Sequence, residues 1–516
     1  MNIAFVASEM YPLIKTGGLA DVAYALPKAL NKMKNDVRVF IPKYSKINNE
    51  YLKDSKYVTS VDIYNEIYNI ISVEIDGITV YLVENRTYFE RDSLYDCWDN
   101  DIQFATFCEV VLISLEKIGF KPHVINCNDW QTGVLPYFLN ARYKFREFYK
   151  DIKTLYTIHN LRFQGHFSKR SLEHHHYQFE DNYVNFMKIA ILNSDKINTV
   201  SETYAQEIKT HFFGEGLDYY LRMRDHDLSG IVNGIDIDVF NPETDKSLVK
   251  NYNLSSFKNK LENKRALQKE FGLPISDNTP IISMVTRLDP QKGLDLLDHV
   301  IKEIMNNDAV QIIILGSGHE KYEKKFSNLA KKYPDKLGVY IGYNGALANR
   351  IYAGSDMYLM PSHYEPCGLS QLISLRYGTI PIVRETGGLN DTVQAYNEFT
   401  HSGNGFSFKN YNAHDMLHTI RYAEDFYYNK KDLWNSLIKT AMSSDYSWEQ
   451  SAEKYLKLYK NNLDEFKELH NYFEEDKENS MKLGENYLYK GLKLKDKTVD
   501  VNNPNEFIKA LFGGAK

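Results

Sequence analysis

The sequence predicts an α/β fold made of two doubly wound, parallel-sheet domains. Short apolar segments rich in β-branched residues alternate with amphipathic segments, which is the pattern of a parallel sheet wrapped by helices. The phrase TGGLxD occurs twice, at residues 16–21 and 386–391, each time after a strand-like segment. At 516 residues the chain is also too long for one ordinary core. We therefore expect two similar halves that face a common ligand.

The alternation of segments also sets the expected domain boundaries. It places one domain at residues 1–240 and a second at 261–447. The polar stretch 241–260 is expected to link them. The amphipathic stretch 448–470 is expected to form a long helix that returns across the molecule, and residues 471–516 a C-terminal extension of unknown role.

The composition is ordinary for a globular protein, with 43% hydrophobic and 25% charged residues. A net charge of −6 gives no electrostatic reason to expect a nucleic acid or an anionic membrane as partner. There is no signal-like start and no membrane-length apolar run, so we expect a cytoplasmic location. The four cysteines lack a CxxC spacing, and we expect no metal site and no cofactor.

The loop at Lys15 is the first candidate site. It follows the predicted strand Asn2–Ala7, and Gly17 and Gly18 precede a helix. Two glycines let backbone N–H groups approach a ligand, and the helix dipole and the lysine favour an anion. This pattern indicates a phosphate or a phosphorylated sugar, although an ordinary strand-to-helix turn would have the same glycines.

Arg287 and Lys292 form the second candidate, in the segment TRLDPQKGLDLL between a strand and a helix. An arginine fork and a lysine point charge on one loop suit a diphosphate. A solvated basic turn is the alternative.

Three further loops carry groups that suit a sugar or a base. His159 and Asn160 follow one strand, and Glu365 precedes a helix, where its carboxylate could accept sugar hydroxyls or stabilise a cationic carbon. The alternative for the histidine is a loop residue whose hydrogen bonds are all made within the protein. The alternative for Glu365 is a carboxylate that only stabilises the helix N-terminus through the helix dipole. Tyr343 could stack on a flat base. The histidines at 174–176 are expected on a solvated surface or a flexible loop, and a metal site there is not expected because consecutive histidines cannot all face one ion.

Seven motifs in this order resemble bacterial glycogen synthases and plant starch synthases: KTGGLADV, NDWQTG, IHNLRFQG, VNGID, TRLDPQKGLDLL, EPCGLSQL and TGGLNDTV. The similarity extends from Met1 to about Tyr459. It implies two Rossmann-like domains facing a deep cleft, the GT-B architecture. It also implies retaining transfer of α-glucose from ADP-glucose to the non-reducing end of an α-1,4-glucan such as glycogen.

The resemblance also assigns roles to residues. It implies a catalytic set of His159, Arg287, Lys292 and Glu365. It implies a donor-binding set of Lys15, Gly17, Gly18, Tyr343, Cys367, Gly368, Leu369 and Thr386. Residues expected at the acceptor or in the cleft are Asp21, Asp129, Trp130, Asn160 and Asn233. One departure is that many relatives have histidines where this chain has Asn128 and Gln131.

Three other functions compete with this interpretation. The same fold could use UDP-glucose or a small sugar acceptor. A glucan-binding scaffold without turnover would not need the cations that neutralise a diphosphate. A dinucleotide-dependent oxidoreductase would want GxGxxG directly after the first strand, which MYPLIKTGG does not supply. The sequence does not give the oligomeric state.

Overall fold

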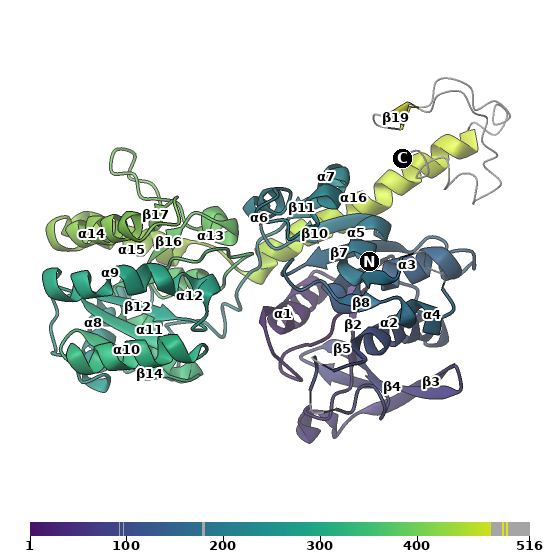
Figure 1. Cartoon of the computed structure of the whole chain (residues 1–516), viewed down its shortest axis with the longest axis horizontal. Coiled ribbons are helices and arrows are strands. Elements are labelled where there is room, and N and C mark those ends of the chain that lie inside the picture. Colours follow the sequence, from purple (N-terminus) through teal and green to yellow (C-terminus); the bar gives the residue numbers. More distant parts are fainter. Residues whose placement is uncertain (92, 96, 178–180, 476–487, 490–491, 494–516) are drawn as a thin grey trace. The chain divides into compact units, whose positions relative to one another are not determined.

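A computed structural model of the chain describes residues 1–516 except 92, 96, 178–180, 476–487, 490–491 and 494–516. The chain forms two compact units, residues 1–457 and 458–516, and the first unit contains both large sheets (Figure 1). Most of the expected extension 471–516 lies outside the described residues. None of the described helices has both the length and the apolar composition that a membrane span requires.

The first sheet has nine strands and gathers the first half of the chain. In spatial order they are β11 (Leu228–Gly230), β10 (Lys196–Thr199), β7 (Lys153–Ile158), β6 (Val124–Asn128), β1 (Asn2–Val6), β2 (Asp36–Pro42), β5 (Ile78–Glu84), β4 (Glu66–Ile75) and β3 (Lys56–Ile63). The helices of this half are α1 (Gly18–Lys32), α2 (Asn100–Lys117), α3 (Leu135–Phe138), α4 (Arg170–His174), α5 (Phe186–Asn193), α6 (Glu202–Glu207) and α7 (Asp218–Met223). A two-stranded sheet pairs β8 (His166–Ser168) with β9 (Tyr183–Asn185).

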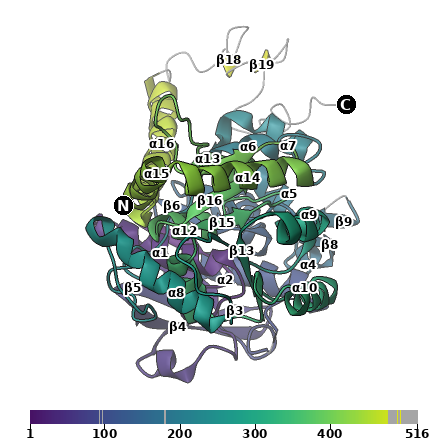
Figure 2. The ribbon, with the colours of Figure 1, turned by 90° about the vertical axis from the view of Figure 1, so that its left-hand side faces the viewer.

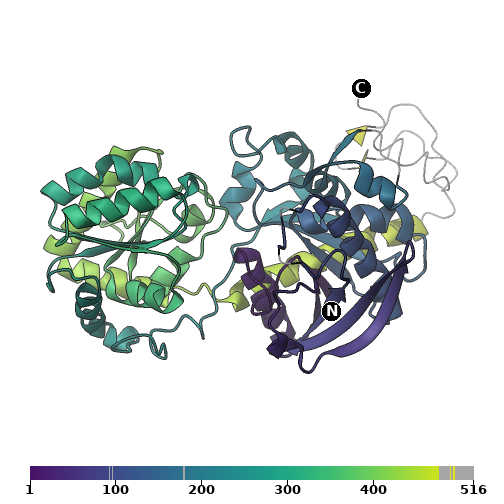
Figure 3. The same cartoon turned by 60° about the horizontal axis from the view of Figure 1, so that its bottom comes forward.

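The first sheet is mixed, which corrects the expectation of a purely parallel one. Strands β3 and β4 pair with each other, and β4 with β5, in antiparallel fashion (Figure 3). Along much of β4, and at the end of β3, buried residues alternate with exposed or partly exposed ones. Such strands have one solvated face, so they lack the continuous apolar run that identifies a buried parallel strand.

The second sheet is parallel throughout its described strands. In spatial order these are β14 (Leu337–Ile341), β13 (Gln311–Gly316), β12 (Ile281–Val285), β15 (Met357–Met360), β16 (Ile380–Arg384) and β17 (Phe406–Phe408). Its helices are α8 (Lys260–Glu270), α9 (Leu294–Asn307), α10 (Glu320–Lys332), α11 (Gly345–Gly354), α12 (Ser370–Arg376), α13 (Gly387–Thr392), α14 (Ala413–Asn429) and α15 (Lys431–Ser443). The helix α16 (Trp448–Glu475) follows, and β18 (Leu488–Tyr489) pairs with β19 (Leu492–Lys493).

Both faces of the second sheet are covered by helices (Figures 1 and 2). Ile282 and Ile312 belong to one buried cluster, together with side chains of α9 and α14. Their neighbours Ile281 and Ile313 belong to another cluster, with side chains of α8 and α11. Because alternate side chains of a strand point to opposite faces, this division gives a core on each side of the sheet. The doubly wound arrangement is therefore confirmed.

Most candidate residues lie in loops that leave the carboxyl ends of neighbouring strands; the exceptions are Tyr343, which follows β14, and Asn233, which follows β11. In the first sheet the loops follow β1, β6 and β7, which are adjacent in the order β7-β6-β1. In the second sheet they follow β12, β15 and β16, which are adjacent in the order β12-β15-β16. Each sheet therefore gathers its candidate loops at one edge, where ligands of open α/β sheets bind.

Candidate functional site

We call the loops at residues 16–18 and 386–388 the first and second TGG loops. The first TGG loop already makes hydrogen bonds to a carboxylate of the chain. Glu9 Oε2 accepts hydrogen bonds from the Thr16 backbone N–H at 2.6 Å and from the Thr16 hydroxyl at 2.7 Å, and its Oε1 accepts one from the Gly17 N–H at 3.2 Å. Glu9 is buried, and burial raises the pKa of its carboxyl group. The backbone N–H groups of Thr16 and Gly17 are therefore already bonded to a carboxylate of the chain itself. Glu9 itself was not predicted.

Lys15 and Gly18 are the parts of this loop that remain accessible. Lys15 Nζ lies 2.7 Å from Asp21 Oδ1, and the two side chains are 45% and 29% exposed. Gly18 begins α1, and a Cβ built on it would have no atom within 4 Å. A ligand phosphate at the start of α1 would meet open space, the first turn of the helix and a lysine that is paired with Asp21.

The second TGG loop repeats the arrangement with another glutamate. Glu207 Oε1 accepts hydrogen bonds from the Thr386 hydroxyl at 2.9 Å and from the Gly387 N–H at 3.1 Å. Burial raises the pKa of Glu207 as well. The likeness of the two loops thus extends from sequence to the group that each one binds. Nothing in the sequence near Thr386 indicates Glu207, which lies at the end of α6.

Lys292 and Glu365 are brought together from different loops. Lys292 Nζ lies 2.7 Å from Glu365 Oε2, and the side chains are 15% and 8% exposed. The Ser362 hydroxyl donates to the same oxygen at 3.1 Å. Arg287, in contrast, is 69% exposed, and its Nη2 lies 3.4 Å from Asp289 Oδ2. One cation of the predicted pair is therefore held in place, and the other extends into solvent.

The turn after β15 packs backbone to backbone against the second TGG loop. The Gly388 N–H donates to the Glu365 carbonyl at 3.1 Å. A Cβ on Gly387 would lie 2.0 Å from that carbonyl oxygen, and one on Gly388 would lie 2.1 Å from the Cys367 oxygen. Both glycines are therefore required by close approach of the two loops. Burial raises the pKa of the Cys367 thiol to about 12, so it is not a thiolate nucleophile at neutral pH.

Asp129, in the loop after β6, makes hydrogen bonds to the loop that follows β7. Its Oδ1 accepts hydrogen bonds from the His159 N–H at 2.8 Å and from the Asn160 N–H at 3.4 Å. Asp129 has a φ of 54°, in the left-handed region. Burial raises its pKa to about 7, and burial lowers the pKa of His159 to about 3. The imidazole of His159 is therefore neutral at pH 7.

The other predicted residues have varied surroundings. Tyr343 is 88% exposed just after β14, so both ring faces are accessible for stacking. Trp130 instead packs against Phe104 and Phe167, with ring centroids 5.1 and 5.4 Å away. Asn233 is buried, and its Oδ1 has no hydrogen-bond partner among the described residues. Leu369 precedes α12, and Gly368 has a φ of 73° that favours glycine.

In the histidine run at 174–176, His174 and His176 are exposed as expected, but His175 corrects the expectation of a solvated surface. His175 is fully buried. Its Nδ1 contacts Glu109 Oε2, and its Nε2 lies 3.0 Å from the Thr106 hydroxyl. Arg142 Nη1 lies 2.7 Å from the other oxygen of Glu109. This buried network supports the core around α2. Within the described ranges, no three metal-ligating side chains cluster.

Comparison with known proteins adds to this geometry. The family "Starch synthase catalytic domain" matches residues 2–223, and "Glycosyl transferases group 1" matches residues 267–439. The glycogen synthase of Bacillus cereus strain Q1 is 52% identical over 475 residues, covering 89% of this chain and 99% of that protein. The glycogen synthase of Clostridium acetobutylicum is 49% identical over 475 residues, with the same coverage of both chains. The chain belongs to the glycogen synthase family.

Solved structures agree with membership of the glycogen synthase family. The catalytic domain of starch synthase IV from Arabidopsis thaliana, determined with ADP and acarbose bound, is 32% identical with a TM-score of 0.81. The match covers 90% of this chain and 99% of that one. A sucrose-phosphate synthase from Thermosynechococcus elongatus, 16% identical with a TM-score of 0.56, shares the fold. The chain is therefore a glycosyltransferase of the GT-B fold, as its sequence motifs predict.

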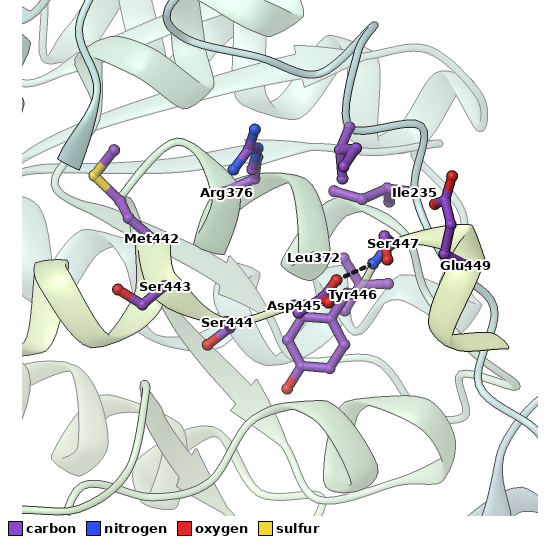
Figure 4. A pocket seen from close by; sticks show the side chains of 11 residues that line it. Ile235, Leu372, Arg376, Met442, Ser443, Ser444, Asp445, Tyr446, Ser447 and Glu449 are labelled. Atoms are coloured by element: carbon purple, nitrogen blue, oxygen red, sulfur yellow. Dashed lines mark hydrogen bonds between the residues drawn. The ribbon is translucent and has the colours of Figure 1, made fainter. Parts of the chain in front are cut away.

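The chain passes from the first sheet to the second near Ile235 and returns near Tyr446, and we call this place the crossing point. A pocket lies there. It has a volume of about 300 Å³ and is lined by Ile235, Leu372, Arg376 and the segment 442–447, among others (Figure 4). The Ile235 N–H donates to the Tyr446 carbonyl at 2.8 Å, so the outgoing and returning segments are bonded here. None of the predicted site residues lines this pocket. The pocket therefore belongs to the crossing point and is separate from the candidate loops.

Proposed function

We propose that the chain transfers the α-glucosyl group of ADP-glucose to the non-reducing end of an α-1,4-glucan, with retention of configuration. The observation that carries this proposal is the ion pair of Lys292 and Glu365, beside the glycine-rich turn after β15. A cation for a leaving diphosphate and a carboxylate for a cationic sugar carbon stand within one ion-pair distance, 2.7 Å. Membership of the glycogen synthase family supports the donor and the acceptor.

Donor binding would use both sheets. Lys15 and the open start of α1 at Gly18 would hold phosphate oxygens, and Lys292 and Arg287 would hold the diphosphate from the second sheet. Tyr343, which is 88% exposed, would stack on the adenine. The nucleotide and the sugar analogue in the related starch synthase structure were ADP and acarbose, which supports this class of ligand.

In the transfer step, the bond between C1 of glucose and the diphosphate oxygen breaks. The electron pair leaves with ADP, whose added charge is stabilised by Arg287 and Lys292. The acceptor 4-hydroxyl forms the new bond to C1 on the same face, and its proton passes to the departing phosphate oxygen. Glu365 stabilises the positive charge that develops on the sugar. Because protein cations take up the diphosphate charge, we expect transfer without an added divalent metal.

We also propose a cytoplasmic location and no nucleic-acid or membrane partner. All four cysteines are free thiols, which is usual in a reducing compartment. The net charge of −6 gives no attraction to nucleic acids or anionic lipids.

The proposed function is tested by offering radiolabelled ADP-glucose or UDP-glucose with glycogen and measuring label in the polymer. We expect incorporation from ADP-glucose, unchanged by chelation of divalent metals. Incorporation from UDP-glucose alone would overturn the donor assignment. Binding of glycogen without any incorporation would favour the scaffold. Activity that vanishes with a chelator and returns with magnesium would contradict the role of the two cations.

A further inference from the structure

Asn128, the last residue of β6, makes hydrogen bonds through both the NH₂ group and the oxygen of its side chain. It is fully buried. Its Nδ2 donates to the Val6 carbonyl at 2.9 Å and to the Asn126 carbonyl at 3.2 Å. Its Oδ1 lies 2.9 Å from Nε2 of His159. The amide therefore joins the backbone of β1 and β6 to the predicted catalytic histidine.

The orientation of this amide follows from its partners. Backbone carbonyl oxygens can only accept hydrogen bonds, so the Asn128 group that faces two of them must be the NH₂. The group that faces His159 is then the carbonyl oxygen, which can only accept. A hydrogen bond therefore requires that Nε2 of His159 carries a proton. In a neutral imidazole the other nitrogen, Nδ1, then carries the lone pair.

We propose that Asn128 is a positioning residue that holds His159 in the Nε2–H tautomer, so that Nδ1 accepts a hydrogen bond from a hydroxyl of the bound sugar. This inference rests on the proposed function, in which His159 lies against the glucosyl group. Asn128 would act through His159 and not touch the substrate.

His159 has a second hydrogen bond, from its backbone N–H to Asp129, which holds the backbone in place. Asn128 fixes the tautomer of the ring. Asp129 Oδ1 accepts the His159 N–H at 2.8 Å. Asp129 is the ionisable side chain bonded to this histidine, and it binds the backbone and not the ring. The tautomer therefore depends on Asn128, and the loop position depends on Asp129. The two residues can be tested separately.

The direct test is nitrogen NMR of the whole protein labelled with 15N-histidine. The His159 signals are identified by their absence in His159→Gln. We expect a pyrrole-type Nε2 and a pyridine-type Nδ1 in the wild type, and a mixture of tautomers in Asn128→Leu. A wild-type His159 with its proton on Nδ1, or with both nitrogens protonated at pH 7, would overturn the proposal.

Kinetics test whether the tautomer matters for transfer. Asn128→Leu should lower kcat/KM for ADP-glucose about 10–100-fold, by analogy with metal-bound histidines, which lose this much when the partner that orients the ring is removed. Asn198→Leu is the matched control, because Asn198 is also fully buried in the first sheet and donates to the Tyr455 hydroxyl at 2.9 Å. It should lose stability without a comparable loss of kcat/KM. Equal losses in the two variants would make Asn128 merely structural.

A second variant keeps the test decisive if Asn128→Leu fails to fold. Asn128→Asp keeps the shape and an acceptor toward Nε2, but its charge favours protonation of the imidazole. We expect kcat/KM to gain an ionisation between about pH 5 and 8, where histidines normally titrate. A pH profile identical to that of the wild type would count against the proposal. If the wild type transfers no glucose while the NMR result holds, the proposed function fails and the tautomer assignment stands.

Discussion

Lys292 Nζ lies 2.7 Å from Glu365 Oε2, and each side chain has little exposure to solvent. A donor diphosphate that uses Lys292 must therefore compete with a carboxylate that already holds it. Desolvation can offset the attraction within such a pair, but removal of one partner leaves the other charge poorly solvated.

Glu365→Gln should lower kcat about 10²–10³-fold, as removal of a transition-state electrostatic contact typically does. A glutamine can still accept hydrogen bonds from the sugar, but it carries no charge for the cationic carbon. ADP affinity, measured by calorimetry, should stay the same or rise, because Lys292 is released from its partner. Collapse of ADP affinity together with kcat would instead make Glu365 a support of the nucleotide site.

Lys15→Ala should reduce kcat/KM for ADP-glucose with little loss of stability. Lys15 is half-exposed and pairs with Asp21 at the surface, and such pairs contribute about 0–1 kcal/mol. Lys32→Ala is the matched control, because Lys32 pairs with Glu449 at 3.2 Å near the other end of α1 and is similarly exposed. The thermal midpoints should move alike, and only Lys15→Ala should affect kinetics. An unchanged kcat/KM would exclude Lys15 from the donor site.

Much of this architecture could be predicted from sequence because buried parallel strands have a strong local signal. The strand expected at Asn2–Ala7 is β1, Asn2–Val6, and every residue from Ile3 to Ala7 is fully buried. The hairpin of β3 and β4 was missed because its strands have a solvated face. His175 was misjudged for a related reason: its burial depends on Glu109, which lies 66 positions away in the sequence.

The candidate site was predictable only in part. Motifs predict which loops carry chemistry, and the topology gathers those loops as expected. The glutamates on the two TGG loops were not predicted, since Glu207 is 179 positions from Thr386 in the sequence. The pairing of Lys292 with Glu365 depends on the adjacency of β12 and β15, which sequence periodicity does not give. Contacts between residues that are far apart in the sequence are thus the part of the site that local patterns do not predict.

Gly234→Ala should destabilise the chain at its crossing point. A Cβ on Gly234 would lie 2.6 Å from the Trp448 nitrogen and 2.7 Å from the Ser447 carbonyl carbon. Overpacking against backbone typically costs about 1–3 kcal/mol, so the thermal midpoint should fall. Gly345→Ala is the control, because its Cβ would meet only the Tyr343 hydroxyl at 3.6 Å. Equal midpoints for the two variants would mean that the crossing tolerates a methyl group.

Asp129 should make both stability and activity depend on pH. Its pKa is raised from the ordinary value of 3.8 to about 7 because burial disfavours the charged form. The folded protein therefore binds a proton that the unfolded chain releases between these two values. By linkage, the contribution of this group to stability is largest below about pH 4 and declines as pH rises to about 7.

Asp129→Asn should therefore flatten the fall of the thermal midpoint between pH 4 and 7, since an amide does not titrate. Glu424→Gln is the control: burial raises the pKa of Glu424 to about 7 as well, but this residue lies on α14, outside the candidate loops. Both variants should flatten the stability profile. Only Asp129→Asn should change kcat/KM, because a neutral amide accepts the 2.8 Å hydrogen bond of the His159 N–H more weakly than a carboxylate, and this bond fixes the loop that carries the imidazole. If Asp129→Asn retained full kcat/KM, the hydrogen bond from His159 would serve the fold alone. If the midpoint of Asp129→Asn still fell with pH as in the wild type, the proton taken up on folding would belong to another group.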